Sequence, residues 1–252
     1  MIYWTKEWGD YGAIRSPFFM DMNKDDLHAF FFHGDIIQMG IGNIFSEIFK
    51  NGIYSPFFAG KTDQVVIDAG AHVGIATYFF SLFSKKIYSL EPCATHFDAL
   101  KRMVEFNKGM SDIVVPINKA LYIKEEKKPL YHCQNETMHS LNHAVQDIGG
   151  EGMEMVQCTT IDKIFEEYNI EHVDFLKLDV EGAEIEIISN SAFKKVAPKI
   201  DKLISELHVW NGRHPHQMID ALKNAGFSKV RYEGGADKAT GKSDALIFFA
   251  EK

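Results

Sequence analysis

From residue 65 onward, apolar and polar residues follow two periods in turn. Short apolar runs rich in β-branched or aromatic side chains indicate strands, whereas apolar positions three and four residues apart indicate helices. The expected strands are 65–68, 87–91, 113–117, 130–133, 155–158, 173–179, 203–207, 229–232 and 245–250. The expected helices are 75–83, 95–109, 159–168, 183–190 and 218–226. This alternation is typical of an α/β fold.

The order of these segments predicts a mostly parallel sheet, because strand–helix–strand units pair in parallel through right-handed crossovers. Pro116 lacks a backbone N–H, so we expect the third strand, 113–117, at an edge of the sheet. The last two strands predict a terminal antiparallel hairpin. Cap signals at 95–98 and 159–162 predict the starts of two helices.

Residues 1–60 differ from the rest of the chain in their aromatic content. They hold 14 of the 32 Phe, Trp and Tyr residues, more than their share of the length. One interpretation is a hydrophobic cluster packed on the main domain, and the other is a lid that lines an apolar or sugar-stacking pocket. Aromatic side chains more often pack, so we favour the first. We therefore expect an N-terminal extension, 1–60, and a main domain, 61–252.

Composition and charge narrow the class of protein. Hydrophobic residues make up 46% and charged residues 25% of the 252 residues, which excludes a disordered chain. The net charge of −8 disfavours nucleic acid and anionic lipid as partners. The three cysteines form no CxxC pattern, and neither a signal peptide nor an apolar stretch of about 18 residues is present. We expect a cytoplasmic protein that does not span a membrane.

Acidic residues end three of the predicted strands and mark the expected ligand site. Asp68, Glu91 and Asp179 each follow an apolar run. Ligands of open parallel sheets bind beyond the carboxyl ends of the strands. We therefore expect these three acids to face one crevice.

The turn at 68–74, DAGAHVG, departs from the dinucleotide fingerprint. That fingerprint, G-x-G-x-x-G, requires three glycines where this chain has Gly70, His72 and Ile75. A pyrophosphate would meet the His72 side chain where it needs bare backbone. A nicotinamide-dependent dehydrogenase is therefore disfavoured.

The acids around this turn suit a cationic adenosyl ligand instead. Glu91 follows Asp68 by about 20 residues, the position at which a carboxylate accepts hydrogen bonds from ribose hydroxyls in nucleotide-binding folds. A second carboxylate, that of Asp68, would repel phosphates but attract the sulfonium and ammonium groups of S-adenosylmethionine. The alternative is that Asp68 and Glu91 only cap helices, and we favour the cofactor.

Five segments together resemble the FkbM family of S-adenosylmethionine-dependent methyltransferases. They are VIDAGAHVG at 66–74, SLEP at 89–92, NKAL at 118–121, TTID at 159–162 and FLKLDVEGAE at 175–184. The resemblance implies a seven-stranded, Rossmann-like class I methyltransferase fold and S-adenosylmethionine as cofactor. It also implies that the cofactor is contacted by Asp68, Gly70, Gly74 and Glu91, with Asn118 near the adenine.

His72 is the main departure from the family pattern, which usually has asparagine at this position. A histidine ring nitrogen still donates a hydrogen bond, so we keep His72 among the expected cofactor-binding residues. Residues 1–60 match no part of the family pattern.

Transfer to an alcohol requires alignment of the acceptor and a base that removes its proton. The candidates at strand ends are Asp179, Glu181, Glu206 and His208. We expect Glu181 or His208 as the base, beside Asp179. Asp179 alternatively holds the amino group of the cofactor, and Glu181 alternatively caps the next helix. Asp179, Glu206 and His208 also suit Mg²⁺ or Mn²⁺, but their spacing is ordinary, so we expect a metal-independent enzyme.

The resemblance points to O-methylation of a sugar, glycan or natural-product-like small molecule. Trp210, in a polar loop, is a candidate for stacking on a sugar ring. Two alternatives stay open. The first is an N-methyltransferase or a methyltransferase of macromolecules, and the second is a non-catalytic cofactor-binding module in which His72 prevents turnover.

Overall fold

The computed structural model describes residues 44, 46–132, 139–141, 152–208, 214–234 and 245–252. The expectations for most of the N-terminal aromatic residues and for Trp210 lie outside these residues. No helix in the described part of the chain combines the length and the apolar character that crossing a bilayer requires.

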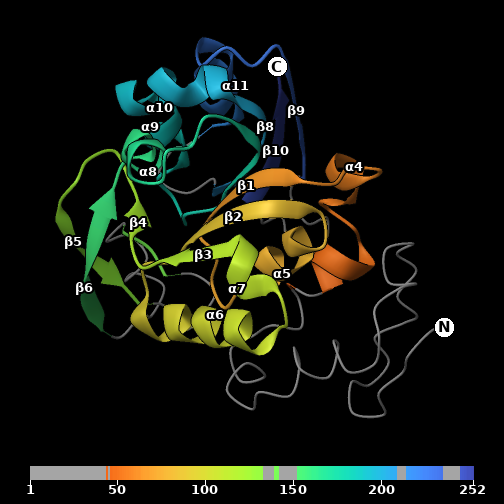
Figure 1. The fold of residues 1–252 in the computed structure, drawn as a ribbon. Helices are drawn as coiled ribbons and strands as arrows, with labels where there is room; N and C mark the ends of the chain where they lie inside the picture. Colours follow the sequence, from red (N-terminus) through yellow and green to blue (C-terminus); the bar gives the residue numbers. More distant parts are fainter. Residues whose placement is uncertain (1–43, 45, 133–138, 142–151, 209–213, 235–244) are drawn as a thin grey trace, which may run out of the picture.

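A seven-stranded sheet with the order β3-β2-β1-β7-β8-β10-β9 forms the centre of the molecule (Figure 1). Its strands are β1 (Gln64–Ala69), β2 (Ser84–Leu90), β3 (Val114–Ile117), β7 (Val173–Leu178), β8 (Ile200–His208), β9 (Lys229–Glu233) and β10 (Ala245–Glu251). Every pair is parallel except those of β10, which runs antiparallel to both β8 and β9. The expected seven-stranded, Rossmann-like fold with a C-terminal antiparallel hairpin is confirmed.

The strand order reverses at β1, whose neighbours are β2 on one side and β7 on the other. Such a reversal opens a crevice at the carboxyl ends of the two central strands. β3 lies at the edge of the sheet, as the proline at position 116 predicted.

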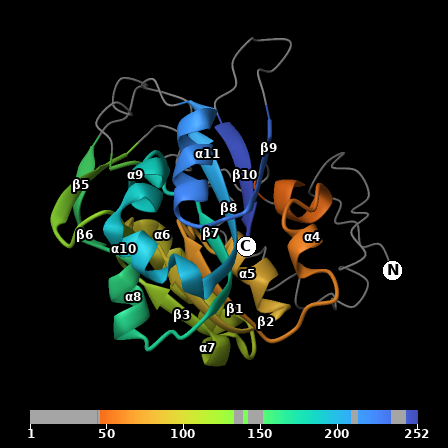
Figure 2. The same ribbon diagram turned by 90° about the horizontal axis from the view of Figure 1, so that it is seen from above.

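Helices cover both faces of the sheet (Figures 1 and 2). One face carries the π-helical turn η2 (Ser46–Lys50), α4 (Ser55–Phe58), α5 (Ile75–Ser81), α6 (Ala94–Phe106) and α7 (Met110–Ile113). The other carries α8 (Ile161–Glu167), α9 (Glu184–Ser189), α10 (Ser191–Val196), the 3₁₀ turn η4 (Ala197–Lys199) and α11 (Pro215–Asn224). Each layer buries its own apolar cluster against the sheet.

The described end of the N-terminal extension packs into the first of these clusters. The ring of Phe58 stacks on that of Phe80 at 5.3 Å between centroids, and Phe57 stacks on Phe249 at 5.5 Å. Phe49, Phe57 and Phe58 are all buried. These rings therefore pack on the main domain. Because Glu47 and Ile48 of the same segment also line the cavity at the strand ends, the choice between the two interpretations stays a prediction, as do residues 1–43 and the division at residue 60.

A second, three-stranded sheet lies beside α6. It consists of β4 (Ala120–Leu121), β6 (Met153–Thr159) and β5 (Lys127–Tyr131), in that order. Its buried residues form a small cluster with Cys93, at the start of α6. The small sheet and the first turn of α6 therefore share one core.

The cap predicted at 95–98 is wrong. The helix begins at Ala94, with Cys93 as the N-cap residue. The carboxylate of Glu91 accepts the Cys93 N–H at 2.9 Å, so a side chain from before the helix satisfies a donor that the capping box would have satisfied. The second signal, at 159–162, does mark a helix start, but Thr160 is the N-cap and its hydroxyl donates to Asp162.

Candidate functional site

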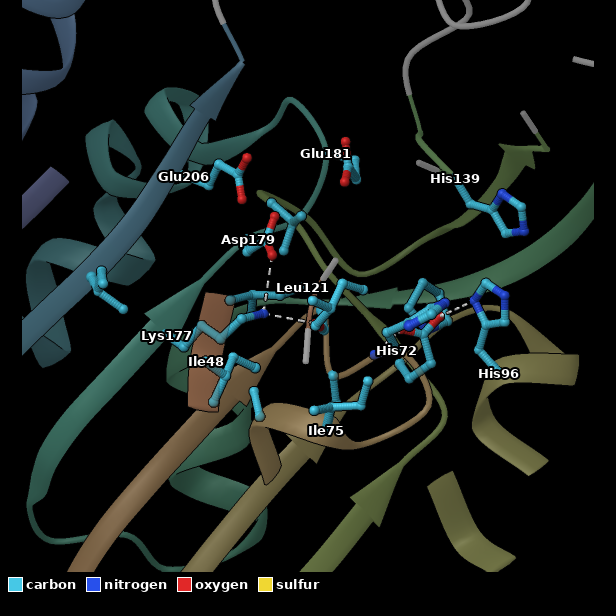
Figure 3. A pocket seen from close by; sticks show the side chains of 18 of the residues that line it. Ile48, His72, Ile75, His96, Leu121, His139, Lys177, Asp179, Glu181 and Glu206 are labelled. Atoms are coloured by element: carbon cyan, nitrogen blue, oxygen red, sulfur yellow. Dashed lines mark hydrogen bonds and ion pairs between the residues drawn. The ribbon is translucent and has the colours of Figure 1, made fainter. Parts of the chain in front are cut away.

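A cavity of about 340 Å³ opens at the carboxyl ends of the central strands (Figure 3). The residues after β1, β2 and β7 line it, together with part of η2 and of β8. Asp179, Glu181 and Glu206 gather on one side, while His72 and His96 lie on the other (Figure 3). The cavity is therefore at the crevice that the strand order predicts.

Glu91 is a buried acceptor at the end of β2. Its carboxylate accepts the backbone N–H of His72 at 2.8 Å and that of Cys93 at 2.9 Å. Burial raises the pKa of Glu91 to about 7, against the lowering effect of these two hydrogen bonds. The residue is 6% exposed and lines the cavity, and its two carboxylate oxygens can accept further hydrogen bonds.

The turn after β1 requires glycine for a packing reason. Gly70 has a φ of +82°, and a Cβ there would lie 1.7 Å from the carbonyl oxygen of Asp179. Gly74 has a φ of +96°, and its Cβ would lie 2.3 Å from a methyl carbon of Met103 in α6. These two glycines bring β1 against β7 and α5 against α6.

His72 also adopts a left-handed backbone, with a φ of +52°. Asparagine and histidine are both enriched in this region relative to other non-glycine residues. This backbone conformation therefore suits the histidine of this chain, and it would equally suit the asparagine that the resemblance led us to expect. The His72 ring lies 4.2 Å from that of His96, in an edge-to-face arrangement.

Lys177 lies beneath the cavity and holds two strand ends together. Its ammonium donates to the Gly70 carbonyl at 2.8 Å and lies 3.2 Å from the Asp179 carboxylate and 3.4 Å from that of Asp68. Burial alone would lower the pKa of Lys177, but the carboxylates of Asp179 and Asp68 outweigh burial and raise it. The lysine is therefore charged at neutral pH.

Four carboxylates face each other at the β7 and β8 side of the cavity: Glu47, Asp179, Glu181 and Glu206. Burial, then Asp179 and Glu206, raise the pKa of Glu181 well above its usual range. Burial, then Asp179 and Glu47, do the same for Glu206. The raised pKa values of Glu181 and Glu206 favour their protonated forms, and a bound cation would relieve the repulsion among the four carboxylates.

Residues 68–229 match the family described as Methyltransferase FkbM domain. This chain belongs to the FkbM methyltransferase family. Among curated proteins, methyltransferase sdnD from Sordaria araneosa is 27% identical over 179 residues, which cover 58% of this chain and 66% of that protein.

The two solved structures that follow share less sequence identity with this chain than sdnD does. SMU.1697c from Streptococcus mutans, in complex with SAH, is 12% identical, with a TM-score of 0.48, and the match covers 80% of this chain and 97% of that one. The N-terminal domain of human METTL16 is 13% identical with a TM-score of 0.48, over 80% of this chain and 67% of that one.

In this FkbM chain, most of the predicted site residues line the cavity. These residues are Gly70, His72, Glu91, Asp179, Glu181 and Glu206. Gly74 is not among the lining residues and packs on α6. His208 ends β8, and its side chain lies outside the described part of the structure.

Two predicted cofactor residues support the site from outside the cavity. The fully buried Asp68 accepts the Thr77 hydroxyl at 2.6 Å and pairs with Lys177. Asn118 is exposed, and its amide donates to the carbonyls of Glu91 and Pro92 at 2.9 and 3.1 Å. Their contacts with the cofactor stay predictions.

Sequence reasoning missed two charged contributors to the cavity. Lys177 interrupts the apolar strand at 173–179. A buried lysine needs an acidic partner, so this interruption was the signal in the sequence for an ion pair at this position. Glu47 belongs to the N-terminal segment that matches no family motif, so no signal pointed to it.

Proposed function

We propose that this FkbM-family protein transfers the methyl group of S-adenosylmethionine to a hydroxyl group of a sugar, glycan or natural-product-like small molecule. One observation carries the proposal: a single cavity has the buried Glu91 carboxylate on one side and a group of carboxylates with raised pKa on the other. The Glu91 carboxylate suits the ribose hydroxyls of the donor as a hydrogen-bond acceptor. The group of carboxylates suits the reacting centre, where a proton has to be removed.

The lining residues fit the donor in charge and in hydrogen bonding. Glu91 keeps free acceptor capacity for the ribose hydroxyls after its two backbone bonds. Five carboxylates line the cavity, and among the described lining residues Lys177 is the only lysine or arginine. When bound, S-adenosylmethionine supplies an electrophilic methyl group on a positively charged sulfur, and the Asp179 carboxylate and the acceptor oxygens of the other lining carboxyl groups suit that charge.

Three of the four carboxylates at the β7 and β8 side have distinct parts in the proposal. Asp179 is fixed by Lys177 at 3.2 Å and holds the ammonium of the donor. Glu181 accepts the proton of the hydroxyl acceptor, since its raised pKa brings a carboxylate closer to the strength that a base needs near neutrality. Glu206 keeps this base close to protonation through their mutual repulsion.

The charge of the cavity also favours a neutral acceptor. The ammonium of Lys177 is already paired with Asp68 and Asp179, so the described lining offers no other lysine or arginine to a phosphate. A phosphorylated or nucleic-acid acceptor would meet carboxylates. A hydroxylated small molecule or glycan meets no such repulsion.

Two measurements on the full-length chain test this function. Calorimetry with S-adenosylmethionine and with S-adenosylhomocysteine should show one site each. Incubation with a methyl-labelled donor and a panel of sugars, glycans and hydroxylated natural products, followed by mass spectrometry, should show label on oxygen. Label on nitrogen or on RNA would replace the acceptor class, binding without transfer to any acceptor would favour the non-catalytic module, and absence of donor binding would reject the proposal.

A further inference from the structure

A cysteine and two histidines converge at the rim of the cavity, on the side away from the carboxylates of Asp179, Glu181 and Glu206. One ligand atom from each of Cys93, His96 and His139 lies within 4.8 Å of the other two. Cys93 and His96 are buried and His139 is half-buried. His96 and His139 line the cavity, and their rings stack at 4.8 Å between centroids (Figure 3).

These three residues come from separate parts of the fold. Cys93 and His96 occupy the N-cap and first turn of α6. His139 precedes Ser140, which pairs with Tyr131 at the end of β5. The cluster therefore spans the junction between α6 and the small sheet.

We propose that Cys93, His96 and His139 bind one zinc ion, which ties the start of α6 to the small sheet beside the cavity. Sulfur and imidazole nitrogen are the donors that zinc favours, and three protein ligands leave one position for water or a further residue. Tetrahedral bonds of about 2.0–2.3 Å put donor atoms roughly 3.3–3.7 Å apart, so the three groups need to close in by about an ångström.

Glu154 in β6 stands next to the proposed ligands and supports their arrangement. Its carboxylate accepts a hydrogen bond from the Cys93 thiol and the backbone N–H of Ala94 at 3.3 Å. It also lies 3.4 Å from the His132 ring. Zinc binding forms a zinc–sulfur bond and releases the thiol proton to the solvent. Outer carboxylates of this kind orient the ligands of zinc sites.

The test uses full-length protein without a histidine tag, kept in a thiol-free reductant. Metal analysis and calorimetry with zinc should show one ion per chain. Cobalt should give the sulfur-to-cobalt absorption band in the near ultraviolet that reports a cysteine ligand. Cys93→Ser should abolish this band, and His139→Ala, which changes the least buried ligand, should weaken zinc binding by about 100-fold or more.

Two variants elsewhere serve as controls. Cys158→Ser alters the other described cysteine, and His172→Ala alters an exposed group of His172, Asp174 and Asp201. Both should retain full zinc binding. Stoichiometric zinc that survives Cys93→Ser and His139→Ala, or a folded wild-type chain that takes up no zinc, would overturn the proposal. Because the readout is bound metal, the result is independent of methyl transfer, and calorimetry with S-adenosylmethionine tests that function separately.

Discussion

The ammonium of Lys177 lies 3.4 Å from the carboxylate of Asp68, and both side chains are buried. The same ammonium donates to the Gly70 carbonyl and contacts Asp179. One lysine thus joins β1, the turn that follows it and the end of β7. The geometry of the cavity depends on this ion pair.

We expect Lys177→Met to lower the free energy of unfolding by about 3–5 kcal/mol, because it leaves the Asp68 carboxylate buried without a counter-charge. Lys163→Met, which breaks the exposed pair of Lys163 with Glu166, should change the free energy of unfolding far less, because solvent screens this pair. Urea unfolding followed by circular dichroism measures both. Equally small losses of unfolding free energy in the two variants would show that the buried ion pair stabilises the fold no more than the exposed pair does.

Gly70→Ala should destabilise the protein far more than Gly60→Ala. Both glycines have positive φ, +82° and +67°, so both substitutions incur a backbone cost of about 1–3 kcal/mol. A Cβ at Gly70 would in addition overlap the Asp179 carbonyl, whereas one at Gly60 meets nothing within 4 Å. The difference in unfolding free energy between the two variants isolates the close approach of β1 and β7, and identical values would contradict it.

Glu91→Gln should weaken S-adenosylmethionine binding by about tenfold to a hundredfold, or roughly 1.5–3 kcal/mol. The introduced amide keeps one acceptor oxygen. Its NH₂ group replaces the second carboxylate oxygen and would face a backbone N–H that this oxygen accepts in the wild type. Calorimetry measures the dissociation constant. Glu167→Gln, at an exposed surface pair with Lys119, is the matched control and should bind the donor normally. Unchanged affinity in Glu91→Gln would remove the ribose role of this residue.

Glu184 predicts a pH dependence of stability. Its carboxylate accepts the N–H groups of Gly182 and Val180 at 2.8 and 3.2 Å, and burial raises its pKa to about 7 from an ordinary value of 4.5. The folded state therefore binds this proton more tightly than the unfolded state. The contribution of Glu184 to stability falls as the pH rises from 4.5 to 7, by about 1.4 kcal/mol per unit, and is constant above that range.

Glu184→Gln removes this titration and keeps an acceptor oxygen. The unfolding free energy of the variant minus that of the wild type should therefore increase from pH 4.5 to 7 and then level off. Urea unfolding at half-unit pH intervals measures the difference. A difference that is flat across the range would contradict a raised pKa at this position.

The proposed roles of Glu181 and Asp179 separate turnover from binding. Glu181→Gln should lower kcat by about 10²–10⁴ with donor affinity retained, because only the proton acceptor is lost. Asp179→Asn should weaken donor binding, because it removes the charge proposed to hold the ammonium. Labelled-methyl transfer and calorimetry measure the two effects, with the exposed Glu186→Gln as control. Normal turnover in Glu181→Gln would transfer the role of base to another group.

Local patterns predicted most strands but not their full extent. The strand expected at 87–91 begins at Ser84, because its polar first residues continue the ladder with β1 as far as Gln64. The helix cap at 95–98 failed because Glu91, which precedes the helix, already satisfies a backbone donor. Both errors have the same cause: a partner supplied from outside the local pattern.

The amino-acid order alone was sufficient for the α/β class, the glycine turn after β1 and the acids at the strand ends, because these depend on residues close together in the chain. It did not reveal that Lys177 joins Asp68 to Asp179, that Glu47 reaches the same cavity, or that His139 meets Cys93 and His96. Those contacts join segments far apart in sequence. They form when the helices and the two sheets bury their apolar faces, which local spacing does not record.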